Sequence, residues 1–175
     1  MIPVFSERKD PLSEYLSPVL KGYLYDCLSE DYCLRSDMKF LVNIPLPFTP
    51  SDYVTFQKGG DISLADLADN IIVTMGADSG FKYGARYKRL LAKLFDEKLV
   101  GAILSRAGEQ LQQKEYPRAC IYARACLLLE NDDVSAMYLY ACSCREWYLS
   151  LEGDEEAFEQ ITALKEEANT YFEYC

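Results

Sequence analysis

Apolar residues after residue 60 recur with the period of an α-helix. The first stripe follows Ser63 and Asp66, which are spaced as a capping box, and it ends at Gly76. This stripe consists of Leu64, Leu67, Ala68, Ile71, Ile72 and Met75. The same periodicity predicts further helices over residues 79–97, 99–114, 116–130, 134–151 and 155–174, with Ser79 placed to cap the first of these.

The first sixty residues show a different, mixed pattern. Asp10 and Pro11 form a helix start, and the apolar stripe that follows predicts a helix to about residue 30. Residues 38–44 are typical of a buried strand, prolines at 45, 47 and 50 exclude helix, and Tyr53–Phe56 is a second β-prone run. We expect either a small β-hairpin or an extended segment packed over the helices, and the pattern slightly favours the extended segment.

The middle pair of predicted helices carries a specific series of large and small residues. The series is Leu104, Ala107, Gly108 and Leu111 in the first helix, at the spacing W-x2-L-G-x2-Y, followed by Tyr116, Ala119, Ala123 and Cys126 in the second. It resembles the tetratricopeptide repeat, best over residues 99–133, and more divergent copies begin near Leu64 and Met137. Small residues in such repeats allow two helices to approach closely.

This resemblance implies an all-α fold of antiparallel helical hairpins stacked as a short tetratricopeptide-like solenoid. The solenoid would occupy residues 61–175, with residues 1–60 as an N-terminal cap that includes the first helix, and the two parts would form one compact unit. Stacked hairpins present a groove, so the resemblance also implies a non-enzymatic adaptor or scaffold that binds a protein or peptide. By register, the groove residues are Ser105, Glu109, Gln112, Gln113, Tyr138 and Arg145, with Trp147 as an exposed anchor.

The charge of the chain is −10 and it is unevenly distributed. Residues 91–175 contain 8 basic and 16 acidic side chains, which favours a basic partner and opposes binding to nucleic acid or an anionic membrane. Against this trend, one predicted helix carries a basic stripe, a weak candidate for anion or nucleic-acid binding, at Lys82, Arg86, Arg89 and Lys93. We expect this stripe to face solvent or to pair with the acidic cluster Glu152, Asp154, Glu155, Glu156 and Glu159.

The residue types that are missing limit the chemistry further. The chain has no histidine, and its seven cysteines include no C-x2-C pair. Triads with a histidine base and histidine-containing zinc sites are therefore excluded, and we expect no metal, no cofactor and no catalytic residue. The cysteines fit the role of small apolar residues in a reducing compartment. Because no apolar span reaches 18 residues, we expect a cytoplasmic protein without membrane contact.

Two alternatives to the binding module stay open at this level. One is a small enzyme or ligand-binding protein whose pocket lies between residues 38–60 and the basic helix 82–93, with Tyr53, Lys82 and Arg86 inside it. The other, less favoured alternative is a nucleic-acid binder that uses the basic stripe beside tyrosines 83 and 87.

Overall fold

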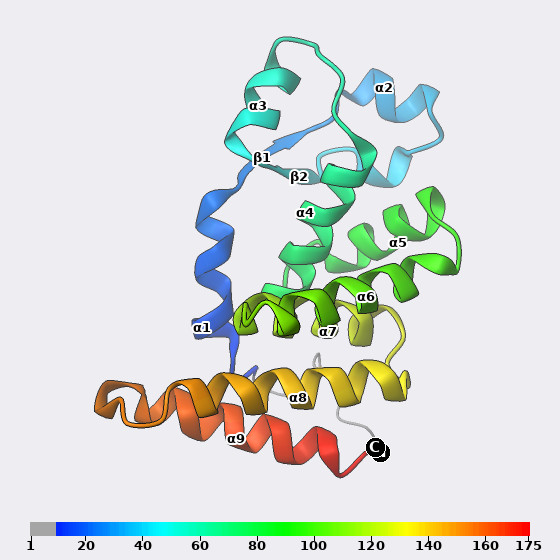
Figure 1. Cartoon of the computed structure of the whole chain (residues 1–175). Coiled ribbons are helices and arrows are strands. Elements are labelled where there is room, and N and C mark those ends of the chain that lie inside the picture. Colours follow the sequence, from blue (N-terminus) through cyan, green and yellow to red (C-terminus); the bar gives the residue numbers. More distant parts are fainter. Residues whose placement is uncertain (1–9) are drawn as a thin grey trace.

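The structure, a computed structural model, describes residues 10–175 and has an all-α fold with one small two-stranded sheet (Figure 1). Two antiparallel hairpins, α6 with α7 and α8 with α9, lie at one end, and α2, α3 and the sheet lie at the other, with α4 and α5 between them. The helices from α4 onward are α4 (Leu64–Ala77), α5 (Gly84–Leu94), α6 (Lys98–Gln112), α7 (Tyr116–Leu129), α8 (Val134–Ser150) and α9 (Phe158–Phe172).

The predicted helices after residue 60 are all present. The predicted ends agree to within a few residues for all of them except α5, which begins at Gly84 and not near Ser79. Local capping explains two of the starts, since the Ser63 hydroxyl accepts the Asp66 N–H at 3.3 Å and the Asp133 carboxylate accepts the Ala136 N–H at 2.8 Å. These short-range signals are readable directly from the sequence.

The repeat copy that begins near Leu64 predicts that α4 pairs with α5 as a hairpin, and this prediction is wrong. Helix α4 packs mainly on α7 and only slightly on α5. The backbones of α4 and α7 approach so closely that a Cβ on Gly76 would lie 2.0 Å from the carbonyl oxygen of Ile121. Gly108, the small residue that the repeat pattern singled out, has open space at the same position. The close helix contact in this fold is therefore made by a different glycine from the one expected.

The N-terminal region differs most from the prediction. The expected helix to residue 30 stops early, because the single turn α1 (Ser13–Leu16) and a 3-10 segment, η2 (Ser17–Gly22), give way to strand β1 (Leu24–Cys27). The predicted strand at residues 38–44 is instead a 3-10 turn, η3 (Lys39–Leu41), which follows the short helix α2 (Glu30–Arg35). Gly22 and the β-prone sequence after it account for the change at β1.

The strand predicted for the second β-prone run, Tyr53–Phe56, is also wrong, since these residues lie in helix α3 (Pro50–Gln57). The Thr49 hydroxyl accepts the Asp52 N–H at 3.2 Å, and Pro50 occupies the first helical turn, where its missing N–H costs nothing. This N-terminal cap outweighs the β propensity of residues 53–56.

The sheet pairs β1 with β2 (Pro45–Phe48) in antiparallel register, with Asp26 opposite Leu46. Pro45 and Pro47 occupy the alternate positions whose carbonyls point away from β1, so no ladder N–H is lost. These carbonyls instead accept hydrogen bonds from side chains of two helices. Tyr87 of α5 donates to the Pro45 carbonyl at 2.6 Å, and Asn70 of α4 donates to the Pro47 carbonyl at 3.3 Å. The two bonds fix the sheet over α4 and α5.

Candidate functional site

A pocket of about 620 Å³ lies where the N-terminal segments cover α4 and α5, and we call it the cap pocket. Its walls come from residues far apart in the chain and are mostly apolar. The lining residues are Leu28, Ser29, Tyr32, Met38, Leu41, Leu46, Phe48, Phe56, Gly59, Gly60, Asp61, Ile62, Leu64, Leu67, Leu90 and Leu94.

The local structure around residues 56–62 shapes one wall of the cap pocket. Phe56 of α3 stacks on Phe48 of β2 with ring centroids 4.7 Å apart, which holds α3 against the sheet. Gly59 then adopts a left-handed conformation, with φ of 72°, and ends the helix. The chain then lines the pocket with Asp61 and Ile62 before α4 begins.

Two large apolar side chains stand at the mouth of the cap pocket with much of their surface in solvent. Tyr32 of α2 is 50% exposed and Leu64 of α4 is 58% exposed. Exposed apolar groups that continue into an apolar hollow are typical of a binding site. Asp61 is the one charged residue among the lining side chains.

The basic stripe lies beside the cap pocket, with Lys82 just before α5 and the other three members within it, and three of the four make contacts within the chain. Lys93 binds Asp37 at 2.8 Å, Arg89 lies over the ring of Phe40 at 4.4 Å, and Lys82 lies over the ring of Tyr83 at 5.1 Å. The hydrogen bond and the charge of Lys93 hold the pKa of Asp37 below its ordinary value.

Of the two expectations for the basic stripe, exposure to solvent is confirmed for all four residues, and pairing with the acidic cluster at residues 152–159 is wrong. The α8–α9 turn, which carries all of the cluster except Glu159, lies far from α5 in Figure 1. Among residues 10–175, no ion pair involves these five carboxylates, and the structure leaves all five exposed. Arg86, the fourth basic residue, is also exposed.

The predicted groove residues fall into two groups. Four of them, Ser105, Glu109, Gln112 and Gln113, lie in or directly after α6 and are exposed. The other two, Tyr138 and Arg145, lie on α8 and are exposed, and both contact the ring of Phe172 in α9. The Phe172 ring centroid is 6.0 Å from the Tyr138 ring centroid and 6.0 Å from the guanidinium carbon of Arg145.

The prediction that Trp147 is an exposed anchor is wrong, because its side chain is only 7% exposed and belongs to the hydrophobic core. The helix α8 is covered on one side by α7 and on another by α9. A helix between two neighbours buries more of its circumference than one amphipathic stripe suggests.

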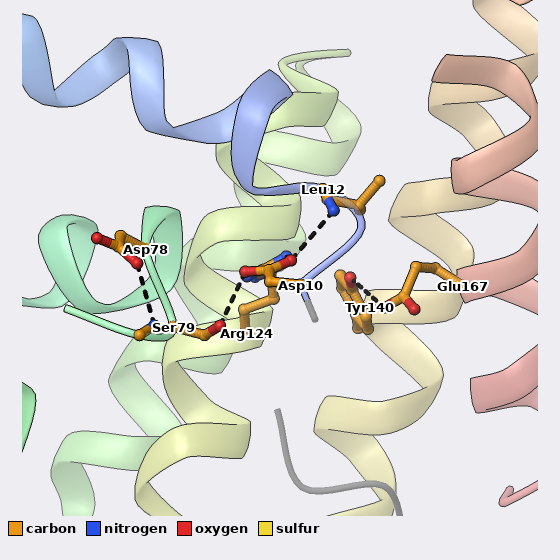
Figure 2. A network of polar contacts seen from close by, with 8 residues as sticks. Asp10, Leu12, Asp78, Ser79, Arg124, Tyr140 and Glu167 are labelled. Atoms are coloured by element: carbon orange, nitrogen blue, oxygen red, sulfur yellow. Dashed lines mark hydrogen bonds and ion pairs between the residues drawn. The ribbon is translucent and has the colours of Figure 1, made fainter. Parts of the chain in front are cut away.

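A buried polar network fastens the start of the described chain to its centre (Figure 2). Asp10 accepts two hydrogen bonds from the guanidinium of Arg124 in α7, one from the Ser79 hydroxyl at 2.8 Å and one from the Leu12 N–H at 3.1 Å. Ser79 therefore serves this network and does not cap α5. Nearby, Tyr140 of α8 donates to Glu167 of α9 at 2.8 Å.

The environment of Asp10 favours its charged form. Burial alone would raise the pKa of this carboxyl, but the hydrogen bonds and charge of Arg124, with the bonds from Ser79 and Leu12, outweigh burial and lower the pKa. Since the side chain of Arg124 is fully buried, this network offers no surface to a substrate, and we assign it to holding the start of the described chain against α7.

Cysteine and carboxylate side chains do not gather into a metal centre in the part of the chain that the structure describes. Cys33, Cys120, Cys126, Cys142 and Cys144 are buried in the helical core, as expected for small apolar residues. Burial raises the pKa of the Cys144 thiol, whose sulfur lies 3.8 Å from that of Cys120. The Cys144 thiol is therefore a poor nucleophile in the folded protein.

Sequence reasoning placed a pocket between residues 38–60 and the basic helix as one alternative, and the cap pocket lies there. Its lining contains none of the three residues named for that pocket, Tyr53, Lys82 and Arg86. Its lining residues were missed because they include Leu28, Leu67 and Leu90, which meet only after the sheet folds over α4 and α5. The Gly59–Gly60 pair was the one local signal for a turn at its mouth.

Comparison with known proteins adds no further assignment. No family model, no curated protein and no solved structure matches the chain. Within residues 10–175, no helix has the length and apolar character needed to cross a membrane.

Proposed function

We propose that the protein is a non-enzymatic binding module that holds apolar side chains of a partner protein or peptide in the cap pocket. The observation that carries the proposal is the continuity between the exposed Tyr32 and Leu64 and an apolar hollow of about 620 Å³. Burial of two or three apolar side chains there would supply roughly 2–3 kcal/mol each. This gross gain of roughly 4–9 kcal/mol is reduced by the costs of association and ordering, so these side chains alone would give at best a weak peptide affinity, in about the millimolar range.

The two helical hairpins at the other end support a scaffold role in this proposal. We keep the relation of α6–α9 to tetratricopeptide repeats as part of the proposal, supported by two consecutive antiparallel hairpins with small buried residues such as Ala107, Ala119 and Ala141. The exposed residues of α6, together with Tyr138 and Arg145, offer a second surface for the same class of partner.

A small apolar molecule is the second candidate occupant, because the volume of the cap pocket lies within the range of small-ligand sites. Nucleic acid is a less favoured partner than the sequence alone suggests, since Lys82, Arg89 and Lys93 already contact other groups of this chain.

Selection from a random nine-residue peptide library tests the proposal. The immobilised wild-type protein is expected to enrich peptides with adjacent aliphatic or aromatic residues. The double variant Tyr32→Ser, Leu64→Ser should lose this enrichment, because it removes the apolar mouth while leaving buried side chains in place. The matched control is Leu149→Ser, Phe158→Ser, which removes from the α8–α9 end two exposed apolar side chains whose exposures, 42% and 71%, average close to those of Tyr32 and Leu64.

Equal enrichment by all three proteins would contradict the role of the cap pocket. An enrichment that disappears in the control variant instead would move the site to the α8–α9 end. Saturable binding of a fluorescent naphthylamine probe without any peptide enrichment would favour the small-molecule occupant.

A further inference from the structure

We infer that helix α3 is a movable lid of the cap pocket, which opens to admit the occupant and closes against it, and this inference rests on the proposed function. The first reason is that the inner wall of the pocket is closed off from solvent. Leu41, Leu46 and Phe48 line the pocket, yet each is at most 1% exposed. A partner side chain can therefore reach this inner wall only after part of the surrounding structure has moved.

Helix α3, which lines the pocket with Phe56, is the part of the wall with the weakest hold on the core. Every other α-helix of residues 10–175 contains at least one buried residue, whereas α3 contains none. The walls made by α2 and η3 are anchored by the fully buried Cys33 and Leu41. Since segments with few buried apolar contacts open locally at the lowest free energy, we expect α3 to move while these walls stay in place.

The contacts that hold α3 in place are made with the small sheet. The ring of Phe56 stacks on Phe48 of β2, and Tyr53 lies against the same ring with 6.4 Å between centroids. At the last residue of α3, the side-chain amide of Gln57 donates to the carboxylate of Asp26 in β1. The sheet itself is fixed by its two hydrogen bonds to α4 and α5, so opening separates α3 from the sheet and breaks these contacts.

Glycines at the end of α3 allow the helix to pivot. Gly59 and Gly60 connect α3 to an irregular segment that leads into α4. Glycine changes its backbone angles at little steric cost, and the hinges of lids absorb their motion at such positions. At the other end, Thr49 joins α3 directly to β2. The motion is a pivot about Thr49 that lifts the ring of Phe56 from Phe48 and uncovers the inner wall of the pocket.

Hydrogen exchange and stopped-flow binding test the lid on the whole chain. Exchange is followed by mass spectrometry for the amides of residues 54–57 in α3 and for those of α4, with and without a fluorescent naphthylamine probe. The binding rate of the same probe is measured over a range of probe concentrations. The variants are Gln57→Ala and the matched control Gln112→Ala. Each changes the exposed last residue of a helix, and of the two glutamines Gln57 is the one whose side chain bonds to another element.

In wild type we expect the α3 amides to exchange at least about tenfold faster than those of α4, because α3 opens without unfolding the core. The probe should slow this exchange, and its binding rate should level off at high probe concentration, where opening becomes the slow step. Gln57→Ala removes a bond of the closed lid, so α3 exchange and the limiting binding rate should both rise about two- to fivefold. Gln112→Ala should change neither.

The outcomes separate the lid from the proposed function. A binding rate that rises linearly to the highest probe concentration, or α3 amides that exchange as slowly as those of α4, overturns the lid and leaves the cap pocket as the binding site. Equal effects of Gln57→Ala and Gln112→Ala also overturn the lid, because the bond to the sheet then plays no part. Failure of the wild-type protein to bind either the probe or any library peptide overturns the proposed function and the lid together.

Discussion

Replacing Gly76 by alanine tests the arrangement of α4 on α7 directly. A Cβ added at this position would lie 2.0 Å from the carbonyl oxygen of Ile121, whereas ordinary contacts begin at 3.4 Å. Relief of the clash requires a separation of about 1.4 Å between two helix backbones, and the obstacle is a backbone oxygen that cannot rotate away. The substitution should therefore force α4 and α7 apart over their shared apolar face.

The expected size of the effect is the difference between two opposing contributions. Overpacking of a well-packed contact costs up to about 3 kcal/mol, and we take the upper value because backbone meets backbone. The change from glycine to alanine inside a helix contributes about 1 kcal/mol in the favourable direction. The net loss in the free energy of unfolding is therefore about 2 kcal/mol, or a melting temperature lower by roughly 4–8 °C for a chain of this size.

Urea and thermal unfolding followed by circular dichroism provide the measurement, with Gly108→Ala in α6 as the matched control. The same chemical change there meets open space, so only the gain in helix propensity remains. Gly108→Ala should stabilise the protein by up to about 1 kcal/mol, and the two variants should move in opposite directions.

Two results would refute this reasoning. If Gly76→Ala is neutral or stabilising, α4 and α7 do not approach each other as closely as the structure shows. If Gly108→Ala is as destabilising as Gly76→Ala, then the tetratricopeptide pattern was correct about which glycine makes the helix contact.

Three further predictions concern charge, thiol reactivity and helix capping. The pKa of Asp10 is lowered in the folded state, so its contribution to stability is complete above the ordinary pKa of 3.8 and is lost as the pH falls through the lower folded pKa. Asp10→Asn should therefore reduce the loss of stability that the protein shows at acid pH. In alkylation at pH 8 followed by mass spectrometry, Cys175 should react early and Cys126 only on unfolding, because burial with nearby carboxylates raises the pKa of Cys126 to about 12. Lys88→Met should lower the free energy of unfolding by about 1 kcal/mol in urea denaturation, because the ammonium donates to two terminal carbonyls of α7 at 3.0 and 3.2 Å.

The helices after residue 60 were predictable because their signals are local. A stripe of apolar residues, a capping serine at position 63 and an aspartate at position 133 act within a few residues of themselves. The start of α3 carries the same kind of local signal in Thr49, Pro50 and Asp52, so the prediction that Pro50 excludes helix was wrong, as was the strand predicted from the β-prone residues after it.

The sheet, the helix partners and the pocket depend on distant residues, and the sequence carries no comparable signal for them. β1 pairs with β2 across a connection that contains α2 and η3, and neither strand has strong alternation by itself. Whether Gly76 or Gly108 meets another backbone is decided by which helices become neighbours. The cap pocket forms only when those choices have been made, which is why its lining could not be predicted residue by residue.

The bond between Asp10 and Arg124 has a consequence for the order of folding. The two residues are 114 positions apart, so during synthesis at about 5–20 residues per second the aspartate is made roughly 6–23 s before its partner. The segment around Asp10 cannot reach its final place until α7 has been made. The beginning of the described chain is thus among the last parts to be fixed, and long-range closure of this kind slows folding relative to a string of local hairpins.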